Sequence, residues 1–405
     1  MSLTLFTAMT GLLNQQTKLD VLSNNIANMQ TTGFKGSRVT FRDHISLTLH
    51  GASAPTGKLG GINPQQVGQG MRLSSIDTLM SQGSIQFTGN PMDLAIEGDG
   101  FFILKQDQQT LFTRDGALQI DENGNLMHGA SRLKVQGFQA DEQGNIKPAA
   151  VVTDLTIPVG LTLDANATET ASIAGNLDAR VAVGGSFTNS FVVFDSLGTP
   201  QPVSVTFTKT ANNKWDWLAT NGVSPAGNGT LTFGPDGSSN IATGYFSMTM
   251  ANGSETPLII TPEFTSIAQL AETSALHLVS QDGFPPGTFE GFEVDHQGAI
   301  RGVFTNGQTR LLGKVALARF VNTYGLRHDG SNLFAETATS GRAQMGAPSG
   351  GVIPGSVQAG ALEMANVNLA DQMTQVLLTQ RSFQAAARVL STGDEMLQDV
   401  IALRR

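Results

Sequence analysis

The stretch LDVLSNNIANMQTTGFKG, Leu19–Gly36, begins with the spacing of an amphipathic helix and ends in a glycine-containing turn. Apolar residues recur every seven positions here and upstream, and most positions three residues later are also apolar. This period is typical of a coiled-coil seam. The predicted seam comprises Leu5, Leu12, Leu19, Leu22, Ile26 and Met29. The sequence therefore predicts a helix over residues 1–30.

The other end of the chain carries a second seam with the same period. All fifteen prolines lie between Pro55 and Pro354, so both ends are free to be helical. The second seam comprises Leu369, Met373, Val376, Phe383, Leu390, Leu397 and Ile401. We expect residues 366–405 to form a helix that pairs with the first, either antiparallel or side by side.

Polar residues and a glycine mark the inner ends of both predicted helices. We interpret Asn25, Asn28 and Gly33 as the end of the first helix, where Gly33 takes the left-handed conformation. Asn366 and Asn368 mark the start of the second helix, with Asn368 as its cap. Ordinary capping without any role in assembly explains these residues equally well.

Between the helices the apolar pattern changes to period two with repeated turns, which predicts antiparallel β meanders. Similar meander patterns lie on both sides of a strand-rich unit, so we expect that unit to be inserted in the first β domain. The predicted fold class is mainly β with helical termini, and nested β domains stand on a coiled-coil base of paired terminal helices. The predicted domains are a terminal coiled-coil domain at 1–30 plus 366–405, a connecting arm and loops at 31–75 plus 355–365, an inner β domain at 76–150 plus 280–354, and an inserted outer β domain at 151–279.

Composition excludes several classes of function. The chain of 405 residues has a net charge of −9 and no long basic run, which argues against a nucleic-acid-binding or anionic-membrane surface. It has no Cys, so disulfides and thiolate sites are excluded. No apolar run reaches the roughly 18 residues that span a bilayer, and we expect no membrane insertion. The amino end lacks the features of a cleaved secretory leader, so we expect any export to use another route.

The sequence contains no recognised catalytic or metal-binding pattern. Segments of the form D-x-x-G start at Asp121, Asp141 and Asp295, but they lack the other ligands of a calcium loop and are predicted to be turns. The segment GQTRLLGK, Gly307–Lys314, has five residues where a phosphate-binding loop has four. We therefore predict no catalytic, cofactor-binding or metal-binding residue, no cofactor and no enzymatic activity.

The first predicted helix is unusually poor in charge, because Lys18 and Asp20 are its only charged residues. A two-helix coiled coil in water normally carries charges beside its seam, so the uncharged face indicates further protein contacts. We expect the terminal helices to be disordered in the free subunit and to order when copies pack together. A repeated contact that does not close produces a helical homopolymer. The alternative is an intramolecular helical stalk in a monomer or closed oligomer.

Three long segments resemble the family of bacterial flagellar rod, hook and hook-associated proteins. They are AMTGLLNQQTKLDVLSNNIANMQTTGFKG (Ala8–Gly36), QGSIQFTGNPMDLAIEGDGFF (Gln82–Phe102) and GALEMANVNLADQMTQVLLTQRSFQAAARVL (Gly360–Leu390). Two further segments, which begin FVVFDSLGTPQPVSV and DGFPPGTFEGFEVDH, are similar to the hook members of this family. The resemblance covers essentially the whole chain.

The resemblance implies a structural subunit of the flagellar hook, a short curved tube that transmits motor torque to the filament as a universal joint. It implies an inner tube of paired terminal helices around a narrow channel, with β domains outside. It also implies export through the flagellar type III apparatus to an extracellular position in the flagellum. The expected partners are further copies of the chain and the rod, hook-cap and hook–filament junction proteins.

Two other functions stay open at this point. A distal rod subunit of the flagellar basal body belongs to the same family, although the length and the inserted unit favour a hook subunit. A secreted β-rich adhesin would use Trp215 and Trp217 to stack on a ligand, whereas we expect both to pack in the core or at an edge.

Overall fold

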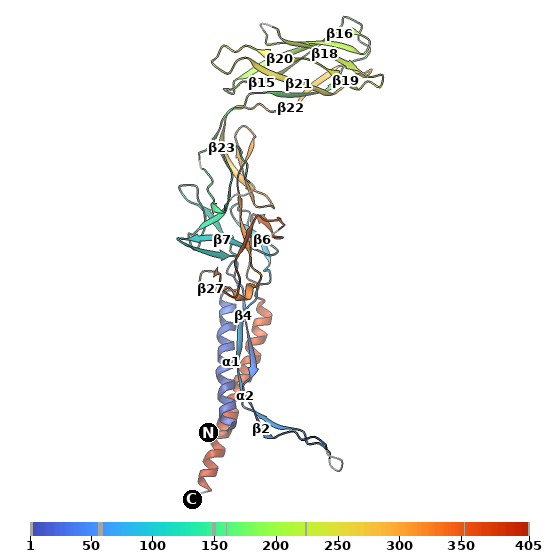
Figure 1. The fold of residues 1–405 in the computed structure, drawn as a ribbon. Helices are drawn as coiled ribbons and strands as arrows, with labels where there is room; N and C mark the ends of the chain where they lie inside the picture. Colours follow the sequence, from blue (N-terminus) through green and yellow to red (C-terminus); the bar gives the residue numbers. More distant parts are fainter. Residues whose placement is uncertain are drawn as a thin grey trace. The chain divides into compact units, whose positions relative to one another are not determined.

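The computed structural model describes residues 3–55, 60–147, 151–158, 160–222, 225–351 and 353–403. The chain is mainly β, with helix α1 (Leu3–Ala27) near one end and helix α2 (Leu369–Ala402) near the other (Figure 1). The predicted fold class is thereby confirmed. The chain forms two compact units: unit 1 comprises Met1–Ile157, Glu293–Arg301 and Leu311–Arg405, and unit 2 comprises Pro158–Phe292 and Gly302–Arg310.

Unit 1 contains both helices and many short strands. Before the insertion these are β1 (Ser37–Asp43), β2 (Ser46–His50), β3 (Gln65–Gly68), β4 (Met71–Thr78), β5 (Ile85–Phe87), β6 (Leu94–Glu97), β7 (Phe101–Gln106), β8 (Gln109–Thr113), β9 (Leu118–Ile120), β10 (Leu126–His128), β11 (Lys134–Gln139) and β12 (Thr153–Asp154). After the insertion they are β26 (Leu317–Arg319), β27 (Arg327–His328), β28 (Leu333–Ala335), β29 (Gln344–Gly346), β30 (Ser356–Ala359) and β31 (Ala361–Glu363), with a 3-10 turn at Thr323–Gly325. Strands β23 (Gly287–Val294), β24 (Ala299–Phe304) and β25 (Thr309–Val315) contribute residues to both units.

The main sheet of unit 1 runs in the order β11–β7–β8–β28–β27, and β26 also pairs with β7. Its core is built on phenylalanine rings in edge-to-face contact. The ring of Phe101 lies 5.9 Å from Phe320 and 5.8 Å from Phe334, and Phe112 lies 4.8 Å from Phe320. Such pairs stabilise a core beyond the burial of their area. The chain continues from α1 into the strands of unit 1 and returns from them into α2.

Four two-stranded ribbons complete unit 1. Strand β1 pairs with β4, and β2 pairs with β3. Strand β30 pairs with β6, and β31 pairs with β5. The last two ribbons bring the segment before α2 against residues that follow the first helix, so both ends of the chain meet in one place.

The three D-x-x-G segments are turns, as predicted. In each segment the glycine has a positive φ and its N–H donates to the carbonyl of the aspartate, at 3.0 Å for Asp121, 2.9 Å for Asp141 and 2.9 Å for Asp295. The aspartate side chains accept backbone N–H groups two and four residues later. The carboxylates therefore stabilise the turns themselves.

Unit 2 is a separate β structure. Its strands are β13 (Thr162–Leu163), β14 (Thr170–Asn176), β15 (Ser186–Phe194), β16 (Pro200–Ala211), β17 (Lys214–Thr220), β18 (Pro225–Phe233), β19 (Ser239–Ala242), β20 (Tyr245–Met248), β21 (Leu258–Ala268) and β22 (Ala275–Gln281). The main sheet runs β15–β16–β17–β18–β20–β21–β14–β22, with β14 and β21 parallel and the other neighbours antiparallel.

Both tryptophans lie in the core of unit 2. Trp215 and Trp217 are fully buried on β17. The ring of Trp217 lies 5.2 Å from Phe246 and 5.6 Å from Phe264, and its indole N–H donates to the Thr243 carbonyl at 3.1 Å. The expectation of core packing is confirmed, and neither ring offers a face to a ligand.

The borders of unit 2 differ from the expected range 151–279 at both sides. Strand β12 pairs with β11, and Leu155 and Ile157 are buried, which assigns residues 151–157 to unit 1. At the other side, Asp282 accepts backbone N–H groups from Glu169 and Thr170 and so belongs to unit 2. Part of the expected border, residues 148–150, lies outside the described residues.

Replacing Phe264 with Ala should destabilise unit 2 by about 3–5 kcal/mol, because the ring is buried against Phe207 and Trp217. Both tryptophans lie in this unit, so urea unfolding followed by tryptophan fluorescence reports on unit 2 alone. Ile259→Ala on the exposed side of the same strand is the control, with an expected loss of about 1 kcal/mol or less. Equal losses for both variants would contradict the assigned core.

Candidate functional site

The two helices lie against each other and run antiparallel. Lys18 Nζ donates to Gln375 Oε1 at 2.9 Å, and Asn25 Nδ2 donates to Gln372 Oε1 at 3.2 Å. Further along, a Cβ at Gly11 would lie 3.8 Å from the Cβ of Ala386. Near the amino end of α1, a Cβ at Gly393 would lie 2.9 Å from Leu5 Cδ2, so this glycine lets Leu5 approach the helix backbone. Increasing numbers in α2 therefore meet decreasing numbers in α1.

The predicted seam of α1 faces protein in the structure. Its members are buried or half-buried, and Met29 lies just beyond the end of the helix. The buried or half-buried members are Leu5, Leu12, Leu19, Leu22, Ile26 and Met29. On α2 the predicted residues Val376 and Leu390 are half-buried as well.

The contact face of α2 also includes residues that the hydrophobic pattern did not identify. Gln372, Thr379, Ala386 and Gly393 are buried or half-buried, and they recur every seven residues. Small and polar side chains at this spacing allow the helices to approach closely. The seven-residue interval of these four residues is present in the sequence, but a pattern of apolar residues alone does not reveal it.

Large apolar side chains of α2 remain exposed. Nine of these side chains form a surface that we name the α2 apolar surface. Five of the nine are predicted interface residues. Its members are Leu369, Met373, Leu377, Leu378, Phe383, Val389, Met396, Leu397 and Ile401. The exposed fraction reaches 46% at Met373 and 68% at Ile401. An extended apolar surface of this kind marks a site of protein contact.

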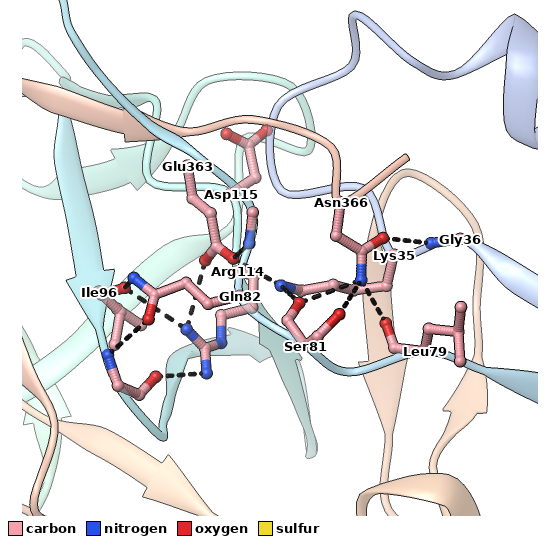
Figure 2. A network of polar contacts seen from close by, with 12 residues as sticks. Lys35, Gly36, Leu79, Ser81, Gln82, Ile96, Arg114, Asp115, Glu363 and Asn366 are labelled. Atoms are coloured by element: carbon pink, nitrogen blue, oxygen red, sulfur yellow. Dashed lines mark hydrogen bonds and ion pairs between the residues drawn. The ribbon is translucent and has the colours of Figure 1, made fainter. Parts of the chain in front are cut away.

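A buried network of polar contacts joins the bases of the two helices to the sheet (Figure 2). We name Lys35, Arg114 and Glu363 the root network. Glu363 is the last residue of β31, Arg114 follows β8, and Lys35 lies between α1 and β1. Lys35 Nζ lies 2.5 Å from Glu363 Oε1, and Arg114 Nη1 lies 3.3 Å from Glu363 Oε2. All three side chains are at most 5% exposed.

Further hydrogen bonds engage other polar atoms of the root network, whereas the buried Nε of Arg114 has no hydrogen-bond partner among the described residues. The N–H of Gly83 donates to Glu363 Oε1 at 2.7 Å. Lys35 Nζ donates to the Ser81 carbonyl at 2.9 Å, and Arg114 Nη2 donates to the Gly98 carbonyl at 2.7 Å. Burial lowers the pKa of Lys35, because desolvation penalises its charged form, and the attraction of Glu363 opposes this effect only in part. Burial lowers the pKa of Arg114 for the same reason.

The predicted helix-end residues lie around this network. Asn366 Oδ1 accepts the N–H of Gly36 at 2.8 Å, and Asn366 Nδ2 donates to the Leu79 carbonyl at 2.7 Å. Asn368 is the N-cap of α2, and its Oδ1 accepts the N–H of Ala370 at 2.9 Å. Asn366 is thus part of the connection between chain ends, whereas Asn368 caps a helix.

On the side of α1, Asn25 is buried and exchanges two hydrogen bonds with the backbone of Ser37, at 2.8 and 2.9 Å. Asn28 lies after the helix and donates to the Asn24 carbonyl at 3.0 Å. Gly33 has a φ of +67°, and a Cβ there would lie 2.5 Å from the backbone nitrogen of Asp115. Glycine is therefore required at position 33 both by the left-handed conformation and by the close approach of the backbone at Asp115, just after β8.

A buried histidine, His128, supports the segment that carries Arg114. His128 Nε2 lies 3.1 Å from Asp115 Oδ2, and His128 Nδ1 lies 2.7 Å from Ser131 Oγ. The N–H of Ser131 also donates to Nδ1, at 3.2 Å. These contacts hold the turn after β10 against the residue next to Arg114, and the serine hydroxyl is engaged within that turn.

Within the described ranges, no group of three or more His, Asp or Glu residues is placed to hold a metal ion. In the same parts of the chain, no helix is both long enough and apolar enough to cross a membrane. The contacts described above are packing contacts, hydrogen bonds and buried ion pairs.

Replacing Glu363 with Ala should destabilise unit 1 by about 3–5 kcal/mol, because Lys35 and Arg114 would stay buried without their carboxylate. Amide hydrogen exchange around β5 and β31 should accelerate, while the tryptophan unfolding transition of unit 2 stays in place. The apolar triple variant K35M/R114M/E363L should recover most of the loss. The control is Glu122→Ala in an exposed turn, and exchange as slow in E363A as in this control would contradict the assigned role.

The sequence matches four described families. Residues 5–35 match "Flagella basal body rod protein", and residues 358–403 match "Flagellar basal body rod FlgEFG protein C-terminal". Residues 95–174 match "Flagellar hook protein FlgE/F/G D1 domain", and residues 161–284 match "Flagellar basal body protein FlaE D2 domain". The first two matches contain most of α1 and α2, and the last covers most of unit 2.

Individual proteins are similar over the full length. The chain is 35% identical to the flagellar hook protein FlgE of Treponema pallidum and 37% identical to that of Borreliella burgdorferi, over 99% of this chain and 99% of each relative. The crystal structure of Helicobacter pylori flagellar hook protein FlgE2 is similar in fold, with a TM-score of 0.55, 13% identity, and coverage of 69% of this chain and 100% of that chain. From its full-length identity to proteins of this name, the chain belongs to the flagellar hook protein FlgE family.

Proposed function

We propose that this chain is the structural subunit of a bacterial flagellar hook and polymerises into a curved, flexible helical tube. Such a tube transmits motor torque to the filament as a universal joint. The observation that carries the proposal is the α2 apolar surface, which the single chain leaves exposed while the small and polar face of α2 meets α1. Burying each large apolar side chain is worth roughly 1.5–3 kcal/mol, so neighbouring copies that cover this surface stabilise the assembly strongly.

The predicted interface residues then divide into two groups. We infer that the members on α1, together with Val376 and Leu390, hold the two helices of one copy together. The exposed members Leu369, Met373, Phe383, Leu397 and Ile401 contact other copies. We infer that two different surfaces meet across such a contact, and a repeated contact of this type forms an open helical polymer when its rotation does not close into a ring.

Family membership also supports proposals about partners and location. We propose that the chain is exported through the flagellar type III apparatus and resides outside the cell in the hook. At its ends the polymer would meet the rod, the hook cap and the hook–filament junction proteins. As a member of a structural flagellar family, the chain acts through assembly.

The alternatives from the sequence receive less support. The adhesin hypothesis depended on Trp215 and Trp217 as stacking residues, and both are buried. The rod hypothesis is less favoured, because relatives named hook protein match 99% of the chain at 35% and 37% identity.

The double variant M373E/F383E should fold as the parent protein does but fail to form tubes. Both side chains are exposed in the single chain, so charge costs little there, whereas a buried carboxylate at a contact between copies costs several kcal/mol. Circular dichroism checks folding, and pelleting with electron microscopy checks assembly. The matched control is V183E/V279E, two exposed valines of unit 2, which should assemble normally. Normal tubes from M373E/F383E would refute the assignment of this surface.

We also expect assembly to order the terminal helices, because one seam with a small and polar partner face stabilises long helices only modestly. In dilute protein, α1 and α2 should exchange their amide hydrogens at least tenfold faster than the buried strands β7 and β17. Assembly into tubes should abolish this difference in exchange rate. Slow exchange of both helices in dilute protein would show that the pair is stable alone.

A further inference from the structure

The carboxyl end of α2 extends past α1. Gly393 meets Leu5 near the first described turn of α1, and every described side chain from Asp394 to Leu403 is exposed. Figure 1 shows this end of α2 projecting beyond the amino end of α1. We name residues 394–403 the α2 overhang. It carries Met396, 64% exposed, and Ile401, 68% exposed, beside Leu397.

The opposite end of the helix pair carries a groove of about 490 Å³. Its apolar lining comes from α1, β1 and the residue after β4, and comprises Val21, Leu22, Val39 and Leu79. Pockets of about 300–1,000 Å³ are large enough to hold ligands of several side chains in size. We name this feature the root groove, because it lies beside the bases of the helices.

The α2 overhang and the root groove also carry complementary charges. The α2 overhang carries the exposed acidic residues Asp394, Glu395 and Asp399. The root groove is lined by Lys18 and Arg38, which are cationic, and by Asp371.

The two cations are available to a partner. Lys18 Nζ contacts the neutral amide of Gln375. Arg38 is exposed and lies 3.9 Å from the half-buried Asp77, and a surface pair at this distance contributes little. Asp371 lies in the first turn of α2, where the helix dipole offsets its charge.

We propose that the α2 overhang of one copy docks in the root groove of a second copy. The apolar side chains of the overhang enter the groove, and its acidic residues meet Lys18 and Arg38. The inference rests on the proposed function and specifies one of its contacts. The overhang and the groove are different surfaces at opposite ends of the same helix pair. A copy whose overhang is docked therefore still offers its groove to a further copy, and the polymer grows head to tail. About 26 residues of α2 separate the two sites, so joined copies are offset by roughly 40 Å along the helix axis at 1.5 Å per residue.

Charge reversal with rescue tests the contact in the full chain. The variants K18E/R38E and D394K/E395K should each reduce the amount of pelleted tube at least tenfold, with unchanged circular dichroism. The quadruple variant, which restores opposite charges across the contact, should recover assembly. The matched control for D394K/E395K is E122K/E272K, which changes two exposed acidic residues elsewhere by the same charge and should assemble normally.

Cysteine cross-linking locates the contact, because the chain has no Cys of its own. Two single variants, V21C in the groove and M396C in the overhang, are assembled as an equal mixture and oxidised. A disulfide-linked dimer should form in the mixture but in neither variant alone, and a mixture of V183C with M396C should give none. Dimers of M396C alone would show that overhangs meet each other, and this would overturn the inference.

The outcomes separate this inference from the proposed function. If the parent protein forms no tubes, the hook proposal fails and the contact with it. Two results with a tube-forming parent protein would refute only the contact between overhang and groove, and the hook proposal would stand. One is that either charge-reversal variant forms as many tubes as the parent protein. The other is that the quadruple variant does not recover tube formation.

Discussion

The buried carboxylate of Glu363 is the contact on which the arrangement of unit 1 depends. It holds Lys35, which follows the first helix, and Arg114, which directly follows strand β8 of the sheet, while Glu363 itself ends β31, the last strand before the second helix. Three segments that are distant in sequence are therefore joined at one point. Removing one partner leaves a buried charge unpaired and strongly destabilises the protein, so this connection depends on all three side chains. Gly33 and Asn366 reinforce it through close backbone approach and through hydrogen bonds that only these residue types provide.

The helices that leave this junction divide their surfaces in an unusual way. In a coiled coil that is stable alone, the largest apolar residues face the partner helix. Here α2 presents Gln372, Thr379, Ala386 and Gly393 to α1 and leaves Met373, Leu377 and Phe383 exposed. We therefore propose that the intramolecular pair is close-packed but weak, and that most of the available hydrophobic stabilisation comes from contacts between copies. This distribution suits a subunit that must remain separate before assembly and hold firmly afterwards.

The fold class, the two terminal helices and the turns at Asp121, Asp141 and Asp295 were predictable from local patterns, because period, proline distribution and turn chemistry are properties of short segments. The direction of the helix pair and its contact face were not predictable in the same way. Apolar periodicity identifies which residues avoid water, but it cannot distinguish burial within one chain from burial between copies. Phe383 and Leu390 share one seam in the sequence, yet the first is exposed and the second half-buried.

The root network was missed for a different reason. Lys35, Arg114 and Glu363 carry no local signal, since isolated charged residues are normally solvated. Their importance comes from contacts across long separations in sequence. The border between the units was similarly displaced, because β12, which the pattern of strands alone assigned to the insertion, pairs with β11 of unit 1.

The separation of these partners has a consequence for the order in which the chain acquires structure. Lys35 and Glu363 are 328 positions apart, and Arg114 and Glu363 are 249 apart. A polypeptide that leaves the ribosome amino end first cannot close unit 1 until nearly all of its length has been synthesised, whereas most of unit 2 is contiguous and has its partners much earlier. The root network therefore forms only after β31, the last strand of unit 1, has been synthesised near the end of translation.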